Sequence, residues 1–191
     1  MSGVSKTMPK IINLPLTGKV IAELKTGDGV LLNGVIYAAR DAAHKRIVDA
    51  LEKGETLPFE LTDQTIYYMG PTPARPGQVI GSAGPTSSYR MDIYAPRLMA
   101  AGLKGMIGKG QRTQPALDAM KKYQAVYFAA IGGTGALIAK SIKKADIVAY
   151  EELGAEAVLK LEVENFPVTV INDIYGGDLY RQGKAKYRIN I

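Results

Sequence analysis

The chain has 191 residues, of which 47% are hydrophobic and 22% are charged, a composition typical of a globular protein with room for one domain. It has no cysteine and one histidine, which excludes disulfides, cysteine nucleophiles, cysteine-ligated clusters and His-rich zinc sites within this chain. Lysine and arginine number 24 against 18 acidic residues, and the resulting net charge of +6 favours an anionic partner.

The distribution of charged and apolar residues narrows the class of partner. No run approaches the roughly 20 apolar residues of a membrane-spanning helix, and the N-terminal MSGVSKTMPK lacks the apolar core of a signal peptide. The basic residues are dispersed and Trp is absent, so we expect no nucleic-acid platform. We therefore expect a cytoplasmic, single-domain protein over 1–191, with 1–13 as a flexible segment and a small anion as ligand.

The first half of the chain predicts short strands and one long helix. Val20–Lys25 and Val30–Ala38 are rich in Val, Leu and Ile, as strands are, and a glycine-containing turn separates them. Ala39–Lys53 carries apolar residues at helical spacing and stops at a glycine. The next expected elements are a strand at Thr65–Met69, a proline-rich loop at 70–77, a strand at Val79–Ala83 and a helix over 90–101.

The second half alternates strands, glycine-rich turns and helices. We expect, in order, the strand Gly105–Ile107, the helix Gln114–Lys122, the strand Ala125–Ile131, the helix Ala136–Lys143, and strands at Asp146–Tyr150, Ala157–Val163 and Val168–Ile171. Repeated strand–turn–helix units predict an α/β fold with many parallel strands. Because strands stand at both ends of the chain, we expect one mixed sheet, or two sheets.

Ligands of open α/β sheets bind where strands end and helices begin. The first such turn, RDAAH, places Arg40 and His44 on one face of a helix, although a solvated arginine and a surface or core histidine are the better explanation of this motif taken alone. In the second, GPTSSYRMD, Thr86 precedes a helix and Asp92 stands in its first turn, as ordinary capping requires. Capping does not explain Arg90, because a cation at a helix start is disfavoured without an anion beside it.

The third turn, GKGQR, places Lys109 between two glycines, so a ligand could approach the backbone closely; a flexible surface turn is the alternative. It is not a P-loop, because Leu103 and Gly110 occupy the positions of a required Gly and Ser/Thr. A fourth turn, GGTG at 132–135, is half of a dinucleotide fingerprint and is explained better by tight strand–helix packing. Three cations at three turns, beside a hydroxyl cluster, suit a dicarboxylate.

These four motifs, RDAAH, GPTSSYRMD, GKGQR and AAIGGTGAL, resemble the β-subunit of class I fumarate hydratase. The same module is the β-subunit of L-tartrate dehydratase and the C-terminal part of single-chain class I fumarases. The resemblance extends from about Leu14 to about Asp173. It implies a swivelling β/β/α domain, and a separate α-subunit that ligates a [4Fe-4S] cluster, with no metal held by this chain.

The resemblance also implies a hydro-lyase of the tricarboxylic acid cycle that reversibly hydrates fumarate in a hetero-oligomer. The site residues it implies are Thr86 as the base, Arg40, Arg90 and Lys109 as carboxylate ligands, His44 near the site, and Asp92 and Arg112 in support. A threonine base needs cations and N–H groups that stabilise a developing alkoxide. The alternatives are an L-tartrate dehydratase β-subunit, a non-catalytic anion-binding or assembly module and, on charge alone, a nucleic-acid binder.

Overall fold

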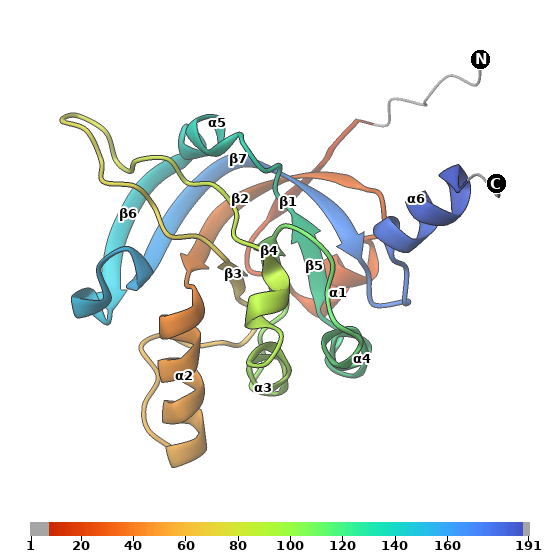
Figure 1. Cartoon of the computed structure of the whole chain (residues 1–191), viewed down its shortest axis with the longest axis horizontal. Helices are drawn as coiled ribbons and strands as arrows, with labels where there is room; N and C mark the ends of the chain where they lie inside the picture. Colours follow the sequence, from red (N-terminus) through yellow and green to blue (C-terminus); the bar gives the residue numbers. More distant parts are fainter. Residues whose placement is uncertain (1–7, 189–191) are drawn as a thin grey trace.

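The computed structural model describes residues 8–188, which form a seven-stranded mixed sheet with helices packed against it (Figure 1). The strands are β1 (Lys10–Asn13), β2 (Gly29–Ala38), β3 (Thr65–Tyr67), β4 (Gly105–Gly108), β5 (Val126–Ala129), β6 (Ile142–Ala149) and β7 (Val158–Asn172). The helices are α1 (Gly18–Ala22), α2 (Asp41–Lys53), α3 (Ala95–Ala100), α4 (Gln114–Tyr123), α5 (Gly135–Ala139) and α6 (Leu179–Tyr187). Two 3-10 helices, η1 (Ser88–Met91) and η2 (Glu151–Glu156), complete the chain.

Five of the strands pair in a ring. Strands β2, β3, β4 and β5 are parallel neighbours, β5 pairs antiparallel with β7, and β7 returns antiparallel to β2. The parallel strand β1 and the antiparallel strand β6 extend the sheet beside β2 and β7. The expected α/β class and mixed sheet are thus confirmed, in the form of a small barrel-like sheet.

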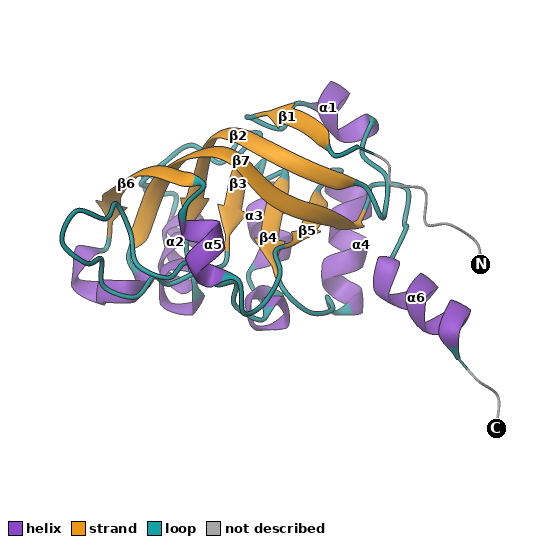
Figure 2. Ribbon diagram, turned by 90° about the horizontal axis from the view of Figure 1, so that it is seen from above, coloured by secondary structure: helices purple, strands orange, loops and turns teal. Residues whose placement is uncertain are grey.

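Helices α2, α3 and α4 lie side by side on one face of the sheet (Figure 2). The alternation of side chains along a strand divides the core between this face and the other. On β3, Ile66 joins the cluster under the three helices, whereas Tyr67 joins the cluster on the opposite side with Phe128 and Phe166. Because β2, β3, β4 and β5 are parallel, their C-terminal ends lie at one edge of the sheet, which we call the rim. None of the helices within residues 8–188 is long and apolar enough to cross a membrane.

The N-terminal expectations need correction. Residues 10–13, expected to be flexible, form β1 and pair with residues 30–33 of β2, whereas residues 1–7 lie outside the described residues. The strand predicted at Val20–Lys25 is wrong, because Thr17 caps the helix α1 and Ile21 and Leu24 point into the core from a helical turn. The Val and Ile residues of this segment favoured a strand in the prediction, but the capping hydrogen bond of Thr17 starts a helix there.

The segment before η1 and the helix after it also differ from expectation. Val79–Ala83 forms no strand; Ala83 is held instead by its N–H to the Gly135 carbonyl (3.1 Å) and by the Tyr67 hydroxyl on its own carbonyl (2.6 Å). The helix expected over 90–101 divides into η1 and α3. Pro96 stands at the start of α3, where a residue without an N–H is tolerated.

Several later elements have bounds that differ from the predicted ones. The helix expected at Ala136–Lys143 stops at Ala139, and β6 begins at Ile142. The two predicted late strands are one strand, β7, which continues through Pro167 with a register shift opposite Leu32 and Gly34. Helix α6 follows β7 and was not expected. The strand expected at Asp146–Tyr150 is the second half of β6, which spans Ile142–Ala149. The other predicted elements are confirmed within one or two residues.

Candidate functional site

Thr86 and Lys109 meet where β3 and β4 end. The Thr86 N–H donates to the Tyr68 carbonyl (2.7 Å), the Lys109 N–H donates to the Thr86 carbonyl (3.1 Å), and the Ser88 N–H donates to the Lys109 carbonyl (2.9 Å). These hydrogen bonds pair the segment 86–88 with the end of β4 in a short parallel β-bridge. A loop residue and a strand-end residue that lie 23 positions apart become direct neighbours.

The Thr86 hydroxyl does not cap a helix. The N-cap of η1 is Ser87, which makes no side-chain capping hydrogen bond. Within residues 8–188, the half-buried Thr86 side chain has no hydrogen-bond partner. The capping explanation of this hydroxyl cluster is therefore wrong, and the Thr86 hydroxyl is left available at the rim.

Arg40 and Arg90 converge on one carboxylate. Arg90 Nη2 lies 2.9 Å from Asp41 Oδ2, and Arg40 Nε lies 3.7 Å from the same oxygen. Arg90 stands in the last turn of η1, where a cation suits the helix dipole, and not at a helix start as expected. The anion beside it is Asp41, at the start of α2.

Arg40 is fixed from two further directions. Its Nη2 lies 3.4 Å from Glu156 Oε1, and Glu156 Oε2 accepts the Ala42 N–H (2.8 Å). A Cβ atom on Gly70 would come within 2.9 Å of Arg40 Cδ, so the arginine stem packs on the backbone that follows β3. Arg40 is thereby a half-buried, oriented guanidinium group with a carboxylate on either side.

Lys109 is exposed, and its stem lies over the turn after β5. Lys109 Cδ is 3.6 Å from the position of a Cβ on Gly132. Gly135, in the same glycine-rich turn, has no room for a side chain because the Ser82 hydroxyl would lie 2.4 Å from its Cβ. The GGTG turn thus serves close packing, as expected, and its Gly132 lies against the Lys109 stem.

Asp92 and Arg112 form a buried ion pair beneath these turns. Arg112 Nε donates to Asp92 Oδ1 (2.5 Å), and Asp92 Oδ2 accepts the Thr113 N–H at the start of α4 (2.5 Å). Both side chains are almost fully buried, at 0% and 3% exposed for Arg112 and Asp92. Asp92 was expected in the first turn of a helix, where it would complement the dipole; it instead ties η1 to α4 from inside the protein.

His44 is buried on α2 behind Arg40. Its Nδ1 lies 2.8 Å from the Arg40 carbonyl, and because a carbonyl only accepts, Nδ1 carries the proton. Burial lowers the pKa of His44 to about 4, with the nearby charge of Arg112 acting in the same direction and Asp41 opposing it. The ring packs edge-on against Tyr68, 5.2 Å between centroids. His44 is thus a neutral group that supports the backbone of Arg40.

The structure therefore brings the predicted residues together in two pairs on one rim. Arg40 and Arg90 meet through Asp41, Thr86 and Lys109 meet through the backbone, and η1 connects the pairs because it carries Arg90 directly after the Thr86 segment. His44, Asp92 and Arg112 lie behind the rim and not on it.

Sequence reasoning missed the carboxylates that orient the arginines. Asp41 stands inside the RDAAH motif, next to Arg40, and could have been suspected from that position. Glu156 belongs to η2, far along the chain, and nothing local in the sequence indicates it. Tyr127 was also missed, because a tyrosine in an apolar run indicates only core.

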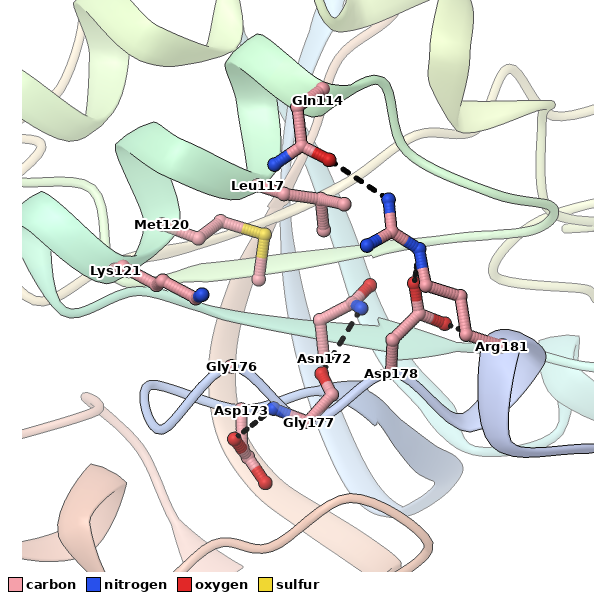
Figure 3. A pocket seen from close by; sticks show the side chains of 10 residues that line it. All are labelled: Gln114, Leu117, Met120, Lys121, Asn172, Asp173, Gly176, Gly177, Asp178 and Arg181. Carbon is pink, nitrogen blue, oxygen red and sulfur yellow. Dashed lines mark hydrogen bonds and ion pairs between the residues drawn. The ribbon is translucent and has the colours of Figure 1, made fainter. Parts of the chain in front are cut away.

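A separate pocket lies between α4 and the loop after β7 (Figure 3). Its polar groups pair with one another: Arg181 donates to Gln114 Oε1 (2.8 Å), and Asn172 donates to the Gly177 carbonyl (3.2 Å). The buried side-chain atoms that lack a partner in residues 8–188 all lie elsewhere. We therefore interpret this pocket as the place where the loop after β7 packs against α4.

Comparison with known proteins gives a family. The family model described as "Fumarase C-terminus" matches residues 4–183. The aerobic class I fumarate hydratase of Salmonella typhimurium strain LT2 is 42% identical over 79% of this chain, which spans only 26% of that relative's length. The anaerobic class I enzyme of Escherichia coli K12 is 37% identical over 95% of this chain and 34% of its own length. A provisionally named L(+)-tartrate dehydratase subunit beta of Methanocaldococcus jannaschii is 41% identical, covering 90% of this chain and 91% of itself.

Proposed function

Because the chain belongs to the fumarase C-terminus family, we propose that it is the β-subunit of a two-subunit class I fumarate hydratase. It would act only with an α-subunit, in the reversible addition of water to fumarate, in the cytoplasm. The match over nearly the whole length of a protein named as a subunit beta supports a role as a separate subunit. The matches to a quarter or a third of single-chain fumarate hydratases support the complementary α-subunit as its partner.

The observation that carries the proposal is the convergence of Arg40 and Arg90 on one carboxylate oxygen of Asp41. Guanidinium groups recognise carboxylates through paired N–H donors, so two of them beside an exposed lysine form a receptor for a dianion. In this proposal a substrate carboxylate replaces or shares Asp41 at Arg90, while Lys109 binds the second carboxylate. Asp41 and Glu156 keep the arginines oriented before the substrate arrives.

The [4Fe-4S] cluster that the family resemblance implies does not fit this chain as its holder. Such clusters are ligated by cysteine thiolates, and the sequence has none. His44 is buried with its Nδ1 committed to the Arg40 carbonyl, and within residues 8–188 no three His, Cys, Asp or Glu side chains gather as a metal site. In the proposal the α-subunit would hold the cluster, which would supply a Lewis acid for the hydroxyl group that leaves.

Thr86 is proposed to move the proton on this side of the substrate. In the direction of dehydration the Thr86 oxygen, as the alkoxide, takes the proton from the carbon next to a carboxylate, the double bond forms and hydroxide leaves. The proton then passes from Thr86 to the hydroxide to give water, and hydration reverses these steps. A threonine hydroxyl ionises far above neutrality, so this role needs neighbouring positive charge. In the proposal that charge comes from Lys109, whose backbone N–H donates to the Thr86 carbonyl, and from Arg90 in the 3-10 helix that follows.

The second candidate is the β-subunit of L-tartrate dehydratase, favoured by the near full-length match to the Methanocaldococcus protein. Tartrate differs from malate by one hydroxyl group, and the rim residues that would contact the carboxylates serve both substrates equally. A non-catalytic anion-binding module is the remaining alternative.

Anaerobic reconstitution tests the proposal. The chain would be purified alone and then mixed with a cysteine-bearing class I fumarase α-subunit, and fumarate and L-tartrate turnover would be measured for each sample. We expect the chain alone to be colourless, free of iron and inactive, and the pair to hydrate fumarate. Turnover of tartrate alone would favour the second candidate. Iron bound stoichiometrically by the isolated chain, or a pair inactive on both acids, would overturn the subunit proposal.

A further inference from the structure

One tyrosine hydroxyl joins the two turns that carry Thr86 and Lys109. Tyr127 lies on β5, fully buried, and its hydroxyl donates to the Gly110 carbonyl at 2.9 Å. Ser88 Oγ lies 2.8 Å from the same hydroxyl oxygen. Because the single Tyr127 proton goes to the carbonyl, Ser88 must be the donor in the second bond. The hydroxyl is thus fully used, once as donor and once as acceptor.

Both partners stand next to the candidate site residues. Gly110 directly follows Lys109 and adopts a left-handed conformation, φ +81°, which only glycine adopts freely. Ser88 lies two residues after Thr86 and is itself fully buried. Its hydroxyl also fills the space beside Gly108, where an added Cβ would come within 2.0 Å of it.

We propose that Tyr127 is a positioning residue that holds the Thr86 segment and the Lys109 turn at a fixed spacing. The inference rests on the proposed function and deepens it, because it says what keeps the threonine and the lysine in working geometry. The backbone bonds between these segments set their order along the rim. The Tyr127 clamp, formed by Tyr127, Ser88 and Gly110, sets how far the two turns stand above β5.

The chemistry of the hydroxyl suits a clamp. Burial raises the pKa of Tyr127, although the Ser88 hydrogen bond and the charge of Arg112 act in the opposite direction. The hydroxyl therefore keeps its proton at neutral pH and remains a donor to Gly110. Removing the hydroxyl would leave a buried carbonyl and a buried serine without their partner, which favours opening of both turns.

The neighbouring residue Tyr67 offers a matched control. It is a fully buried tyrosine on β3 whose hydroxyl donates to the Ala83 carbonyl at 2.6 Å, so Tyr67→Phe also removes a buried hydroxyl and a backbone hydrogen bond. It contacts the opposite side of the sheet and neither partner of the clamp. A general loss of core stability would affect both variants alike.

Amide hydrogen exchange of the full chain, read by mass spectrometry, tests the clamp without any assay of function. In Tyr127→Phe we expect exchange at 86–90 and 108–112 to accelerate at least about tenfold, the change that one lost buried hydrogen bond produces in an opening equilibrium. In Tyr67→Phe we expect exchange at 108–112 to remain at the wild-type rate. Ser88→Ala, which leaves the bond to Gly110 intact, should accelerate 86–90 alone. No acceleration at 108–112 in Tyr127→Phe, or equal acceleration in Tyr67→Phe, would overturn the proposal.

Activity of the pair with the α-subunit, on fumarate, tests what the clamp does. Misplacement of a site by about 1 Å costs up to about 100-fold in rate, so we expect Tyr127→Phe to lose about 10- to 100-fold in kcat/KM with a clear loss in kcat, and Tyr67→Phe to lose far less. Loosened turns with wild-type kinetics would overturn the positioning role. A wild-type pair without turnover would instead overturn the proposed function, and the exchange data would still decide whether the clamp exists.

Discussion

The Thr86 hydroxyl stands at the rim without a capping role, so its chemical role can be tested separately from folding. If Thr86 moves the proton, Thr86→Ala should lower kcat of the reconstituted pair by about 100- to 10,000-fold. The melting temperature should change little, because the side chain makes no hydrogen bond within the described residues. Thr86→Ser, which keeps the hydroxyl but loses the methyl that restricts its rotamer, should retain partial activity. An active Thr86→Ala enzyme would assign the base elsewhere.

Arg90 tests whether carboxylate recognition depends on the planar guanidinium group. Its side chain is 42% exposed and contacts Asp41 at 2.9 Å, so Arg90→Lys should fold normally. Lysine keeps the charge but cannot bind a carboxylate through two parallel N–H donors. We expect Arg90→Lys to lower kcat/KM nearly as much as Arg90→Ala does, a loss of about 2–4 kcal/mol in the stabilisation of the transition state. Near wild-type kcat/KM in the lysine variant would reduce Arg90 to a general electrostatic role.

His44 predicts a pH dependence of stability. Burial lowers its pKa from 6.5 to about 4 in the folded protein, so the unfolded chain binds a proton there first as the pH falls. Stability should therefore be full above about pH 6.5 and decline as the pH falls from 6.5 toward 4, by on the order of 3 kcal/mol. Urea titrations of wild type and His44→Gln between pH 4 and 7.5 measure this. The difference between the two pH profiles isolates His44; identical slopes would show that it does not titrate on unfolding.

Residue identities indicated the rim cations but not what orients them. Arg40, Arg90 and Lys109 could be predicted because each stands at a strand-to-helix turn, and the fold brings such turns to one edge. Glu156 could not be predicted, because its contact with Arg40 crosses more than a hundred residues of chain. Tyr127 looks like a core residue in sequence, since only the third dimension shows what its hydroxyl reaches.

At the scale of elements, the Asp92–Arg112 pair anchors η1 to the start of α4. Removing one partner of a buried ion pair leaves the other charge uncompensated, so Asp92→Asn should cost about 3–5 kcal/mol in the free energy of unfolding. Chemical denaturation measures it. The exposed pair between Arg97 and Glu52, at 2.8 Å, is the control, and Glu52→Gln should cost less than about 1 kcal/mol. Equal costs would show that the buried pair is not an anchor.

The type of an element could be predicted where the segment was long enough to show its hydrophobic period. Helix α2 shows a clear apolar stripe, and β2 a long apolar run, so both were found at nearly their observed bounds. Helix α1 spans little more than one turn, too short for its period to be distinguished from that of a strand, whereas α3 and α5 were found as helices but with bounds that were too long. In such segments a cap or a proline decides the structure, and the apolar residues report burial alone.

At the scale of the whole molecule, the sequence indicated a mixed sheet but not its closure into a ring. Closure depends on β7, which pairs with β6 and β5 along one edge and with β2 along the other. The proline at position 167 divided this strand into two in the sequence-based prediction. The positive φ values of Gly34 (+116°) and Asn165 (+50°) accompany the register shift that lets the strand continue.

Asp173, beyond β7, ties the C-terminal part of the chain to the N-terminal part. Its Oδ2 accepts the N–H (2.9 Å) and the hydroxyl (2.8 Å) of Thr26, and its Oδ1 accepts the N–H groups of Tyr175 and Gly177 (both 2.9 Å). Burial by itself raises the pKa of Asp173, but these four donors outweigh it and hold the pKa below its usual value. The stabilisation is therefore complete above the unfolded pKa near 3.8 and is lost as the pH falls through the lower folded value.

We expect Asp173→Ala to lower the free energy of unfolding by about 3 kcal/mol or more at pH 7, because hydrogen bonds to a charged group are worth about 1.5–3 kcal/mol each and four donors lose their acceptor. Asp178→Ala, which removes the capping bond to the Arg181 N–H (3.1 Å) and the exposed ion pair with Arg181 Nε (3.4 Å), should cost about 0.5–2 kcal/mol. Urea denaturation of both variants at pH 7 and pH 3 measures the difference. The gap between Asp173→Ala and wild type should narrow at pH 3, because the Asp173 carboxyl of the unfolded chain, with a pKa near 3.8, is then mostly protonated and must lose its proton on folding. A gap that is small at pH 7, or equal at both pH values, would show that the two ends of the chain are held together by packing of the loop and not by this carboxylate.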